Sequence, residues 1–543
     1  MRMCTPLQLA AASNKINHII KISPDTSSIL VMAISSSSSS NCQRKTPAAT
    51  GLWWFTFICA ALLYFLSCQR GVSWQDSGMF QWRVLNSDVT GDLGLALAHP
   101  LYIAAGKLFV CFPWGDMPMR LNFLSGIGMA VALANLAVVL FMLTGKRWIG
   151  FIIAAQLAFA HTVWWLATIA EVYTLSLAGL STELLLLLLL IRKPRWFFLA
   201  ALSFVSGLGL SIHNLALLPL PVYGMVALFL IKRKRLPIWS AVAALFCYLT
   251  GAAPYLILVA VSAFHTGNIW NTVQSALFGR YAAEVLNLTS LSASFKVNAV
   301  LIALNFINTL PPLAVLGWIA FRKRIGHMLA TALGAITLIE LIFAVRYNVP
   351  DQFTFFLPSL FMIAVAAGIG LRVLSDTSRA WRNAAITACI VAIIIQPLFY
   401  AVIPRLVEAS GIAVNRARVL PFRDEVRYWL VPWKHTEHSA ELFVAAALKQ
   451  ATPNGIILAD GTSLYPILVA QQLRSLAPSV AVQFNGYPLP GYSDDPLLFR
   501  ERLGNHRLYV VSPVPGYIDP RLIEDADFTR GVNEVLYQVR WKH

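Results

Sequence analysis

Charged side chains are scarce in the first 400 residues of this chain, and several polar residues in its loops are of types that can carry out chemistry. Ten are candidate site residues: Asp76, His99, Glu171, Tyr173, His213, Asn214, Arg280, Arg346, Asp351 and Gln352. Polar groups at membrane depth are costly and tend to mark a site or a pathway. Carboxylate, imidazole and guanidinium groups that converge in one place favour chemistry on an anionic, lipid-associated substrate.

Each residue type indicates a role. Asp76 is the predicted catalytic base, which takes a proton from an acceptor hydroxyl. Arg280 and Arg346 are predicted to hold a phosphate, because a guanidinium matches phosphate oxygens in a bidentate fork. The predicted substrate-binding residues are His99, Glu171, Tyr173, His213, Asn214, Asp351 and Gln352. No ligand spacing demands a metal, although outer carboxylates together with a phosphate could bind Mg²⁺ or Mn²⁺.

Structural roles for the same residues stay open. Asp76 could be a solvated loop acid or a helix cap, and Glu171 could cap a helix at the membrane interface. His213 could link two short helices by a hydrogen bond. Arg280 and Arg346 could extend to lipid headgroups while their stems cover apolar surface.

The elements that must position these residues are membrane helices. The chain has 543 residues, of which 57% are hydrophobic and 12% are charged. A hydrocarbon core takes about 20 apolar helical residues to cross. Eleven runs of this kind predict a polytopic α-helical protein with spans near 52–69, 122–143, 148–166, 170–191, 196–212, 214–231, 238–262, 298–320, 327–345, 353–374 and 383–403.

The net charge of +17 is a topology signal. Residues before 404 hold 27 basic and 11 acidic residues, whereas later residues hold 15 and 14. Basic residues bunch in alternate loops, as in KRKR at 232–235 and RKR at 322–324, and such loops stay in the cytoplasm. This orientation predicts an integral membrane protein with a cytoplasmic N-terminus and the site outside. Nucleic acid is excluded as a partner.

The chain divides into three predicted parts. Residues 1–50, with a run of six serines, are expected to be disordered, and 51–403 form the multi-span domain. Residues 404–543 alternate apolar strand-like and helical segments, which predicts a small extracytoplasmic α/β domain. The stretch GVSWQDSGMFQW is expected to begin a re-entrant or interfacial helix, with Trp74 and Trp82 at the headgroup level.

Several motifs give the chain a family resemblance. They are SWQDSGMF, AHPLYIAAGKLF, GDMPMRLNFLSG, IAEVYTLS, GLGLSIHN and YNVPDQFTFFLPS, in this order between Gly71 and Ser359. The chain resembles multi-pass glycosyltransferases of GT-C architecture, the family that includes the animal O-mannosyltransferase of plexin-type IPT domains. It looks like a bacterial-type member.

The resemblance implies an inverting transfer, outside the cytoplasm, of a sugar such as mannose from a polyprenyl-phosphate-linked donor. It puts Asp76 at the catalytic acid position, and His99, Glu171 and His213 at polar motif positions. The implied partners are the lipid-linked sugar, membrane lipid and an acceptor protein or glycan, with protein Ser/Thr hydroxyls as one candidate acceptor. In a bacterium the protein would lie in the inner or plasma membrane.

Two other classes of function stay open. A secondary transporter or lipid flippase would place its ionisable groups near the membrane midplane and show related halves. A sensor or assembly protein would use the α/β domain as a binding module, with Asp460 at the end of a predicted strand. Most acids of the membrane part lie in outer loops instead, which favours the enzyme.

Overall fold

A computed structural model of the chain describes residues 45–287, 293–410, 419–485, 489, 491–492 and 495–542. Most of the segment predicted to be disordered, 1–50, therefore lies outside the described residues. Residues 45–50 are helical, so the first helix begins six residues before the predicted boundary.

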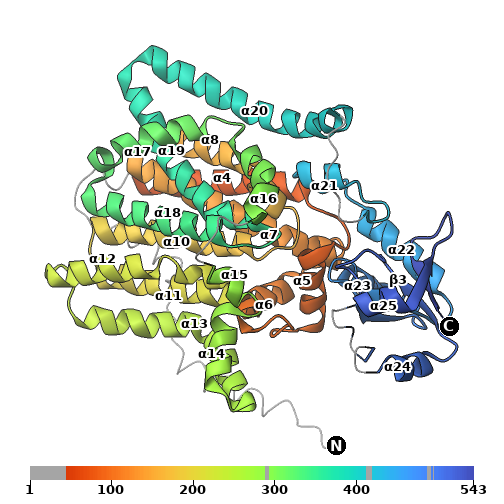
Figure 1. Cartoon of the computed structure of the whole chain (residues 1–543). Coiled ribbons are helices and arrows are strands. Elements are labelled where there is room, and N and C mark those ends of the chain that lie inside the picture. Colours follow the sequence, from red (N-terminus) through yellow and green to blue (C-terminus); the bar gives the residue numbers. More distant parts are fainter. Residues whose placement is uncertain are drawn as a thin grey trace, which may run out of the picture.

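The chain forms a bundle of long helices with a smaller α/β unit at one end (Figure 1). The long helices of the bundle are α4 (Lys45–Ser67), α7 (Met117–Thr144), α10 (Tyr173–Arg192), α11 (Trp196–Ile212), α12 (Leu220–Lys232), α13 (Trp239–Thr266), α17 (Leu310–Ile325), α18 (His327–Arg346), α19 (Leu357–Thr377) and α20 (Arg379–Ala409). Shorter pieces are α8 (Arg147–Ala158), α9 (His161–Leu166), α16 (Ala293–Ala303) and the 3₁₀ turns η2 (Asn214–Leu217), η3 (Leu304–Phe306) and η4 (Gln352–Phe356).

The predicted spans all fall on helices, but not all are long enough to cross a membrane. Within the described residues, eight helices pass on length and hydropathy, and a ninth passes if the segment from Asn298 to Ile325, bent by 74°, counts as one span. The other two predicted spans, 148–166 and 196–212, coincide with α8 plus α9 and with α11, which are shorter. The fold class is confirmed, whereas the count of eleven is met only if these shorter helices also cross.

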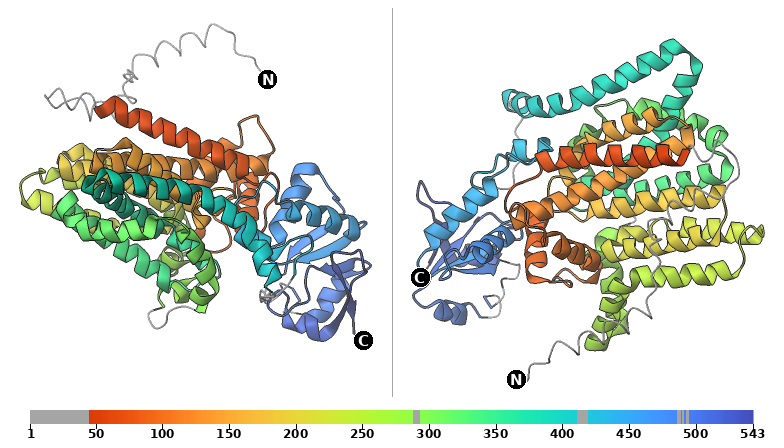
Figure 2. Two further views of the ribbon diagram at one scale, coloured as in Figure 1. Left: turned by 90° about the horizontal axis from the view of Figure 1, so that it is seen from above. Right: turned by 180° about the vertical axis from the view of Figure 1, so that it is seen from behind.

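Four short elements gather at the end of the bundle that faces the α/β unit. They are α5 (Gln75–Asn86), η1 (Leu95–Leu97), α6 (Pro100–Phe109) and α14 (Ile269–Phe278), followed by α15 (Ala282–Val285). Both views of Figure 2 show α5 between the bundle and the α/β unit. The predicted interfacial helix after the first span is therefore present as α5.

The α/β unit is built around a five-stranded sheet of order β2-β1-β3-β5-β4. Its strands are β1 (Gly455–Ala459), β2 (Ala481–Phe484), β3 (Arg507–Val510), β4 (Ala526–Thr529) and β5 (Tyr537–Trp541). Strand β1 pairs parallel with β2 and β3, and β5 pairs antiparallel with β3 and β4. The helices are α21 (Glu425–Leu430), α22 (Ser439–Ala451), α23 (Leu464–Arg474), α24 (Pro496–Leu503) and α25 (Pro520–Asp525). The α/β character predicted for 404–543 is confirmed, although α20 runs past residue 404 to Ala409.

Backbone contact between α17 and α19 holds the centre of the bundle together. A Cβ atom on Gly317 would lie 1.8 Å from the carbonyl oxygen of Ala366, and one on Gly370 would lie 1.9 Å from that of Leu313. Small residues permit such close approach in membranes, where apolar burial alone does not drive helix association.

We expect Gly317→Ala to lower the thermal stability of the detergent-solubilised protein, because overpacking costs about 1–3 kcal/mol. Gly224→Ala is the matched control, since a Cβ there has no neighbour within 4 Å. Thermal unfolding followed by tryptophan fluorescence measures the difference. Equal midpoints for the two variants would contradict the close contact of α17 with α19.

Candidate functional site

Asp76 lies in the first turn of α5, on a segment fixed by buried amides. The side chain of Gln81 donates hydrogen bonds to Ser73 Oγ (3.0 Å) and Asn122 Oδ1 (3.0 Å), and its Oε1 accepts from the Ser73 backbone N–H (3.1 Å). Gln75 has φ of +57°, a conformation that non-glycine residues rarely adopt and that surrounding structure must impose. The turn that carries Asp76 is thus held in a single shape.

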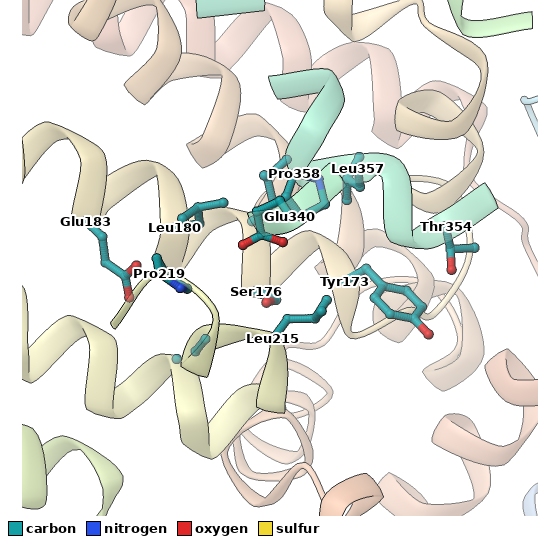
Figure 3. Close-up of a pocket in the computed structure, with 13 residues that line it drawn as sticks. Tyr173, Ser176, Leu180, Glu183, Leu215, Pro219, Glu340, Thr354, Leu357 and Pro358 are labelled. Carbon is teal, nitrogen blue, oxygen red and sulfur yellow. The ribbon is translucent and has the colours of Figure 1, made fainter. Parts of the chain in front are cut away.

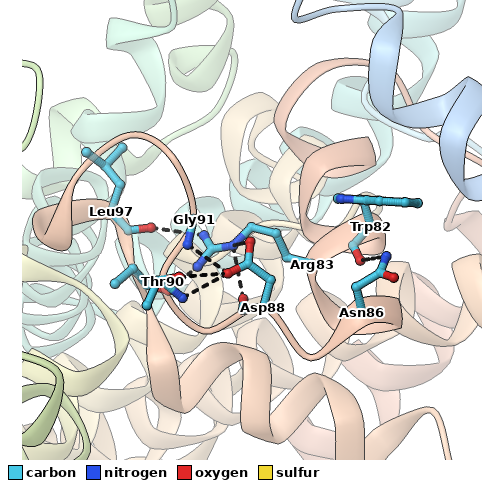
Figure 4. Close-up of polar contacts among 8 residues, drawn as sticks. Trp82, Arg83, Asn86, Asp88, Thr90, Gly91 and Leu97 are labelled. Carbon is cyan, nitrogen blue, oxygen red and sulfur yellow. Dashed lines mark hydrogen bonds and ion pairs between the residues drawn. The ribbon is translucent and has the colours of Figure 1, made fainter. Parts of the chain in front are cut away.

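The other end of α5 fixes the loop that leads to His99. Arg83 is 2% exposed, and its guanidinium donates to the carbonyl oxygens of Asp88 (3.2 Å), Leu97 (3.0 Å) and Ala98. Figure 4 shows the guanidinium held between this loop and the Asp88 carboxylate, 3.6 Å away. One helix therefore positions both Asp76 and the residue before His99.

The rings of His99, His213 and Tyr173 pack in a row, in which the two imidazoles are stacked and the Tyr173 ring is tilted by 45° against His213. The His99 and His213 ring centroids are 5.1 Å apart with planes at 14°, and the Tyr173 centroid is 5.4 Å from that of His213. His99 Nδ1 lies 2.7 Å from the carbonyl oxygen of Ile212, which fixes the ring. Burial lowers the pKa of His99, and so do the neighbouring His213 and Arg83, so its imidazole is neutral at pH 7.

Asp76, Glu171 and Asp351 come from three distant segments and meet at one site. Burial raises the pKa of Glu171 well above its usual value, and the negative charges of Asp76 and Asp351 raise it further. Burial together with Asp76 raises the pKa of Asp351 to about 7. Ser77 Oγ donates to Glu171 Oε1 at 3.1 Å, which links Glu171 to α5.

Asp76 differs from the other two acids in its access to solvent. Its side chain is exposed, yet burial among surrounding atoms raises its pKa. Both observations hold for a carboxyl group on the wall of a recess, where water reaches it and protein surrounds it. Among the described residues, none donates a hydrogen bond to this carboxylate or forms an ion pair with it.

The two predicted phosphate-binding arginines differ in availability. Arg280 is exposed, and it lies close enough to Tyr281 for its charge to act on the tyrosine hydroxyl. The charges of Asp76 and Asp351 act on the same hydroxyl. Arg346 is half-buried and donates to the backbone carbonyl oxygen of Asn287.

Two predicted substrate-binding residues have structural partners. Asn214 donates to the carbonyl oxygens of Ala276 (2.8 Å) and Leu277 (3.3 Å), which ties η2 to α14. Gln352 is 0% exposed and donates to the last turn of α18 at Ala344 and Val345. Both side chains therefore hold neighbouring helices in place.

A narrow cavity continues from Tyr173 into the bundle. It is lined by Tyr173, Ser176, Leu177, Leu180, Glu183, Gly209, Leu215, Ala216, Pro219, Glu340, Thr354, Leu357 and Pro358. Figure 3 shows two carboxyl groups at its walls. Glu183 accepts a hydrogen bond from Tyr223 at 2.8 Å, and Glu340 is 2% exposed. The rest of the lining is mostly apolar.

Several contributors were missed from sequence alone. Ser77, Ser125 and Arg83 are common residue types in ordinary helix positions, and only their contacts reveal their function. Ser125 accepts from the backbone N–H of Glu171 and donates to its carbonyl oxygen. For Ser77, the one indication in the sequence was its place directly after Asp76 in the stretch Asp76-Ser77-Gly78. Within the described ranges, no three His, Cys, Asp or Glu side chains are placed to hold a metal ion.

Comparison with known sequences agrees with the resemblance predicted from the motifs. Residues 94–236 match the family described as the Protein O-mannosyl-transferase TMEM260 N-terminal domain. Over 362 residues, 60% of this chain, the sequence is 26% identical to Protein O-mannosyl-transferase TMEM260 of Mus musculus. The match spans about half the length of that relative.

Comparison with solved structures confirms the GT-C-like fold. ArnT from Cupriavidus metallidurans bound to undecaprenyl phosphate superposes with a TM-score of 0.53 at 13% identity, covering 90% of this chain and 97% of that one. ArnT from the same organism in the apo state also superposes with a TM-score of 0.53. The identity is 14%, and the match covers 91% of this chain and 98% of that one. The described part of this chain, with its eight or more candidate spans, is that of an integral membrane protein.

The raised pKa of Asp351 predicts a pH-dependent stability. A carboxyl group whose pKa is higher in the folded protein stabilises the fold fully below its unfolded value near 3.8, and this contribution is lost as pH rises to about 7. Asp351→Asn cannot ionise, so its unfolding midpoint should fall less than that of the wild type between pH 4 and 7. Thermal unfolding across this range measures it, and parallel curves would contradict a desolvated Asp351.

Proposed function

We propose that this protein is a membrane glycosyltransferase that moves a sugar from a polyprenyl-phosphate donor to an acceptor hydroxyl with inversion. The observation that carries the proposal is the solvent-accessible Asp76 carboxylate, which lies unpaired near the buried Glu171 and the half-buried Asp351 in a fold like that of ArnT. The relative named a protein O-mannosyl-transferase supports mannose as the sugar and a protein Ser/Thr hydroxyl as the acceptor.

The carboxyl groups have different acid–base roles in the proposed reaction. Burial raises the pKa of Glu171 well above its usual value and so favours its protonated form, whereas Asp76 is the accessible group that accepts a proton. The acceptor oxygen forms a bond to the anomeric carbon as its proton passes to Asp76. The bond from that carbon to the phosphate oxygen breaks, and the lipid phosphate leaves with the electron pair. One base suffices for inversion.

Arg280 is the proposed contact for the leaving phosphate. A cation there stabilises the charge that develops as the bond to the sugar breaks. Its exposed guanidinium is available, whereas Arg346 also holds the backbone at Asn287. The apolar residues beside Tyr173, such as Leu177 and Leu215, are the proposed contacts for the first part of the lipid chain.

The packed rings and the remaining acid form the proposed sugar-binding wall. We assign substrate contacts to His99, Glu171, Tyr173, His213 and Asp351, and supporting roles to Asn214 and Gln352. A divalent cation such as Mg²⁺ or Mn²⁺ would take Asp76 and the donor phosphate as its available ligands. The proposed step itself involves only protein groups, the donor and the acceptor.

We also propose that the site lies outside the cytoplasm, with the N-terminus inside. The basic loops gather at the end of the bundle far from the α/β unit, where Asp376 pairs with Arg324 (2.9 Å) and Arg372 (3.0 Å). Basic loops remain cytoplasmic, which leaves α5 and the α/β unit on the opposite side. In a bacterium this would be the outer face of the inner membrane.

A transporter or lipid flippase is the second candidate, and one observation favours it. Glu183 and Glu340 line a cavity within the bundle, and intramembrane carboxyl groups often mark transport pathways. Movement of solute or lipid in vesicles without any sugar transfer would support this candidate over the enzyme.

Asp76→Asn should lower sugar transfer by about 10²–10⁴-fold, because it removes the general base. The assay uses purified protein, a polyprenyl-phosphate mannose donor and a Ser/Thr peptide. Asp92→Asn, which changes an exposed acid of the same outer segment, should retain activity. Equal turnover in the wild type and Asp76→Asn would remove Asp76 from the mechanism.

Arg280→Gln should raise the KM for the donor by about tenfold, because a charge-assisted hydrogen bond contributes about 1.5–3 kcal/mol. Arg233→Gln removes an exposed arginine at the end of α12 and serves as the control. An unchanged donor KM in Arg280→Gln would exclude this side chain from phosphate binding.

A further inference from the structure

The segment that carries Asp76 is bound by the α/β unit as well as by the bundle. Helix α23 packs on α5, and Figure 1 shows the two helices side by side. The α/β unit therefore contacts the proposed catalytic segment directly, in addition to being joined to the bundle by the chain.

Three hydrogen bonds cross from the segment before Asp76 to the α/β unit. The backbone N–H of Val72 donates to Glu441 Oε1 (2.8 Å), and the indole N–H of Trp74 donates to Ser439 Oγ (2.8 Å). The backbone N–H of Gln75 donates to the carbonyl oxygen of Thr462 (3.1 Å). These bonds hold residues 72, 74 and 75, immediately before the base.

Trp74 is the central contact of this interface. It is 1% exposed, and its ring centroid lies 5.2 Å from that of Phe443. The guanidinium carbon of Arg423 lies 5.6 Å from the same ring. The prediction that Trp74 lies at the headgroup level is wrong, because the α/β unit encloses this side chain.

The partners of the segment are themselves fixed. Ser439 Oγ accepts from Trp74 and donates to Glu437, so its hydroxyl has a defined direction. Arg474 holds both carboxylate oxygens of Glu441, at 2.5 and 2.9 Å. The Asp460 carboxylate accepts from the Thr462 N–H (2.8 Å) and shapes the turn that presents the Thr462 carbonyl oxygen. Asp460 thus supports a turn.

Close packing leaves the segment little freedom. A Cβ on Gly71 would lie 2.2 Å from Glu441 Oε1, and one on Gly78 would lie 3.1 Å from Pro466 Cδ. Gln75, which precedes Asp76, has the positive φ described above and donates its backbone N–H to the carbonyl oxygen of Thr462. The unusual backbone shape at residue 75 is therefore stabilised from the α/β side.

We infer that the α/β unit is a positioning element of the active site, in which Ser439, Glu441 and Thr462 hold the segment 72–75 so that Asp76 faces the substrate. The inference rests on the proposed function in one respect, that Asp76 is the base. It goes beyond that function by assigning a role to the α/β unit and naming the residues that perform it. Misplacement of a reacting group by about 1 Å can cost as much as 10²-fold in rate.

The test is a double-mutant cycle between Trp74→Phe and Ser439→Ala in the full-length protein. Each single variant should lower kcat by about tenfold with the donor KM unchanged, because substrate contacts stay in place. The double variant should equal either single variant, since both remove one hydrogen bond. Ser439→Thr keeps the hydroxyl and should retain wild-type kcat.

Gln472→Ala is the matched control. Its side chain donates from α23 to Asn86 Oδ1 (3.2 Å), at the end of α5 far from Asp76, and its loss should leave kcat unchanged. An equal loss of kcat in Gln472→Ala and Ser439→Ala would show a general effect of domain contact and overturn the positioning role. Additive losses in the cycle would overturn it as well.

Hydrogen exchange of residues 71–80 tests the inference without any activity assay. Ser439→Ala should speed exchange in this peptide, and Gln472→Ala should not. Unchanged exchange in Ser439→Ala overturns the positioning role whether or not the protein transfers sugar. Faster exchange, with no sugar transfer by the wild type, would support the positioning of the segment and reject the proposed reaction.

Discussion

Three carboxyl groups held close together in a desolvated site cannot all be ionised at neutral pH. Asp76, Glu171 and Asp351 are in this situation, because burial and mutual repulsion both disfavour the charged forms. The least enclosed of them is Asp76, which solvent reaches and which is therefore the proposed base. The positions of the three segments, the packed rings and the contact with the α/β unit are important because they keep these carboxyl groups close together.

Much of the fold could be predicted because long apolar runs have few alternatives in a membrane. The strand and helix character of residues 455–541 was equally readable from alternating apolar segments. The break between α8 and α9 and the bend before Leu310 were not, because they depend on which neighbours satisfy the backbone. Residue types alone do not show where a helix stops.

The site was predictable in its members but less so in their roles. Scarcity of charge singled out Asp76, Glu171 and Asp351, and the structure brings them together. It also shows Asn214 and Gln352 bonded to helix ends, which a polar residue beside an apolar run does not reveal. Trp74 could not be placed from sequence, since an indole at the end of a span fits a headgroup or a protein interface equally well.

The most direct measurement is an experimental structure of the wild-type protein with a non-hydrolysable polyprenyl-phosphate-sugar analogue. The account predicts the sugar between Asp76 and the packed rings of His99, His213 and Tyr173, with the phosphate at Arg280 and the lipid chain leading toward the apolar residues beside Tyr173. A headgroup bound at the basic loops on the opposite end of the bundle, or out of reach of the Asp76 carboxylate, would contradict it.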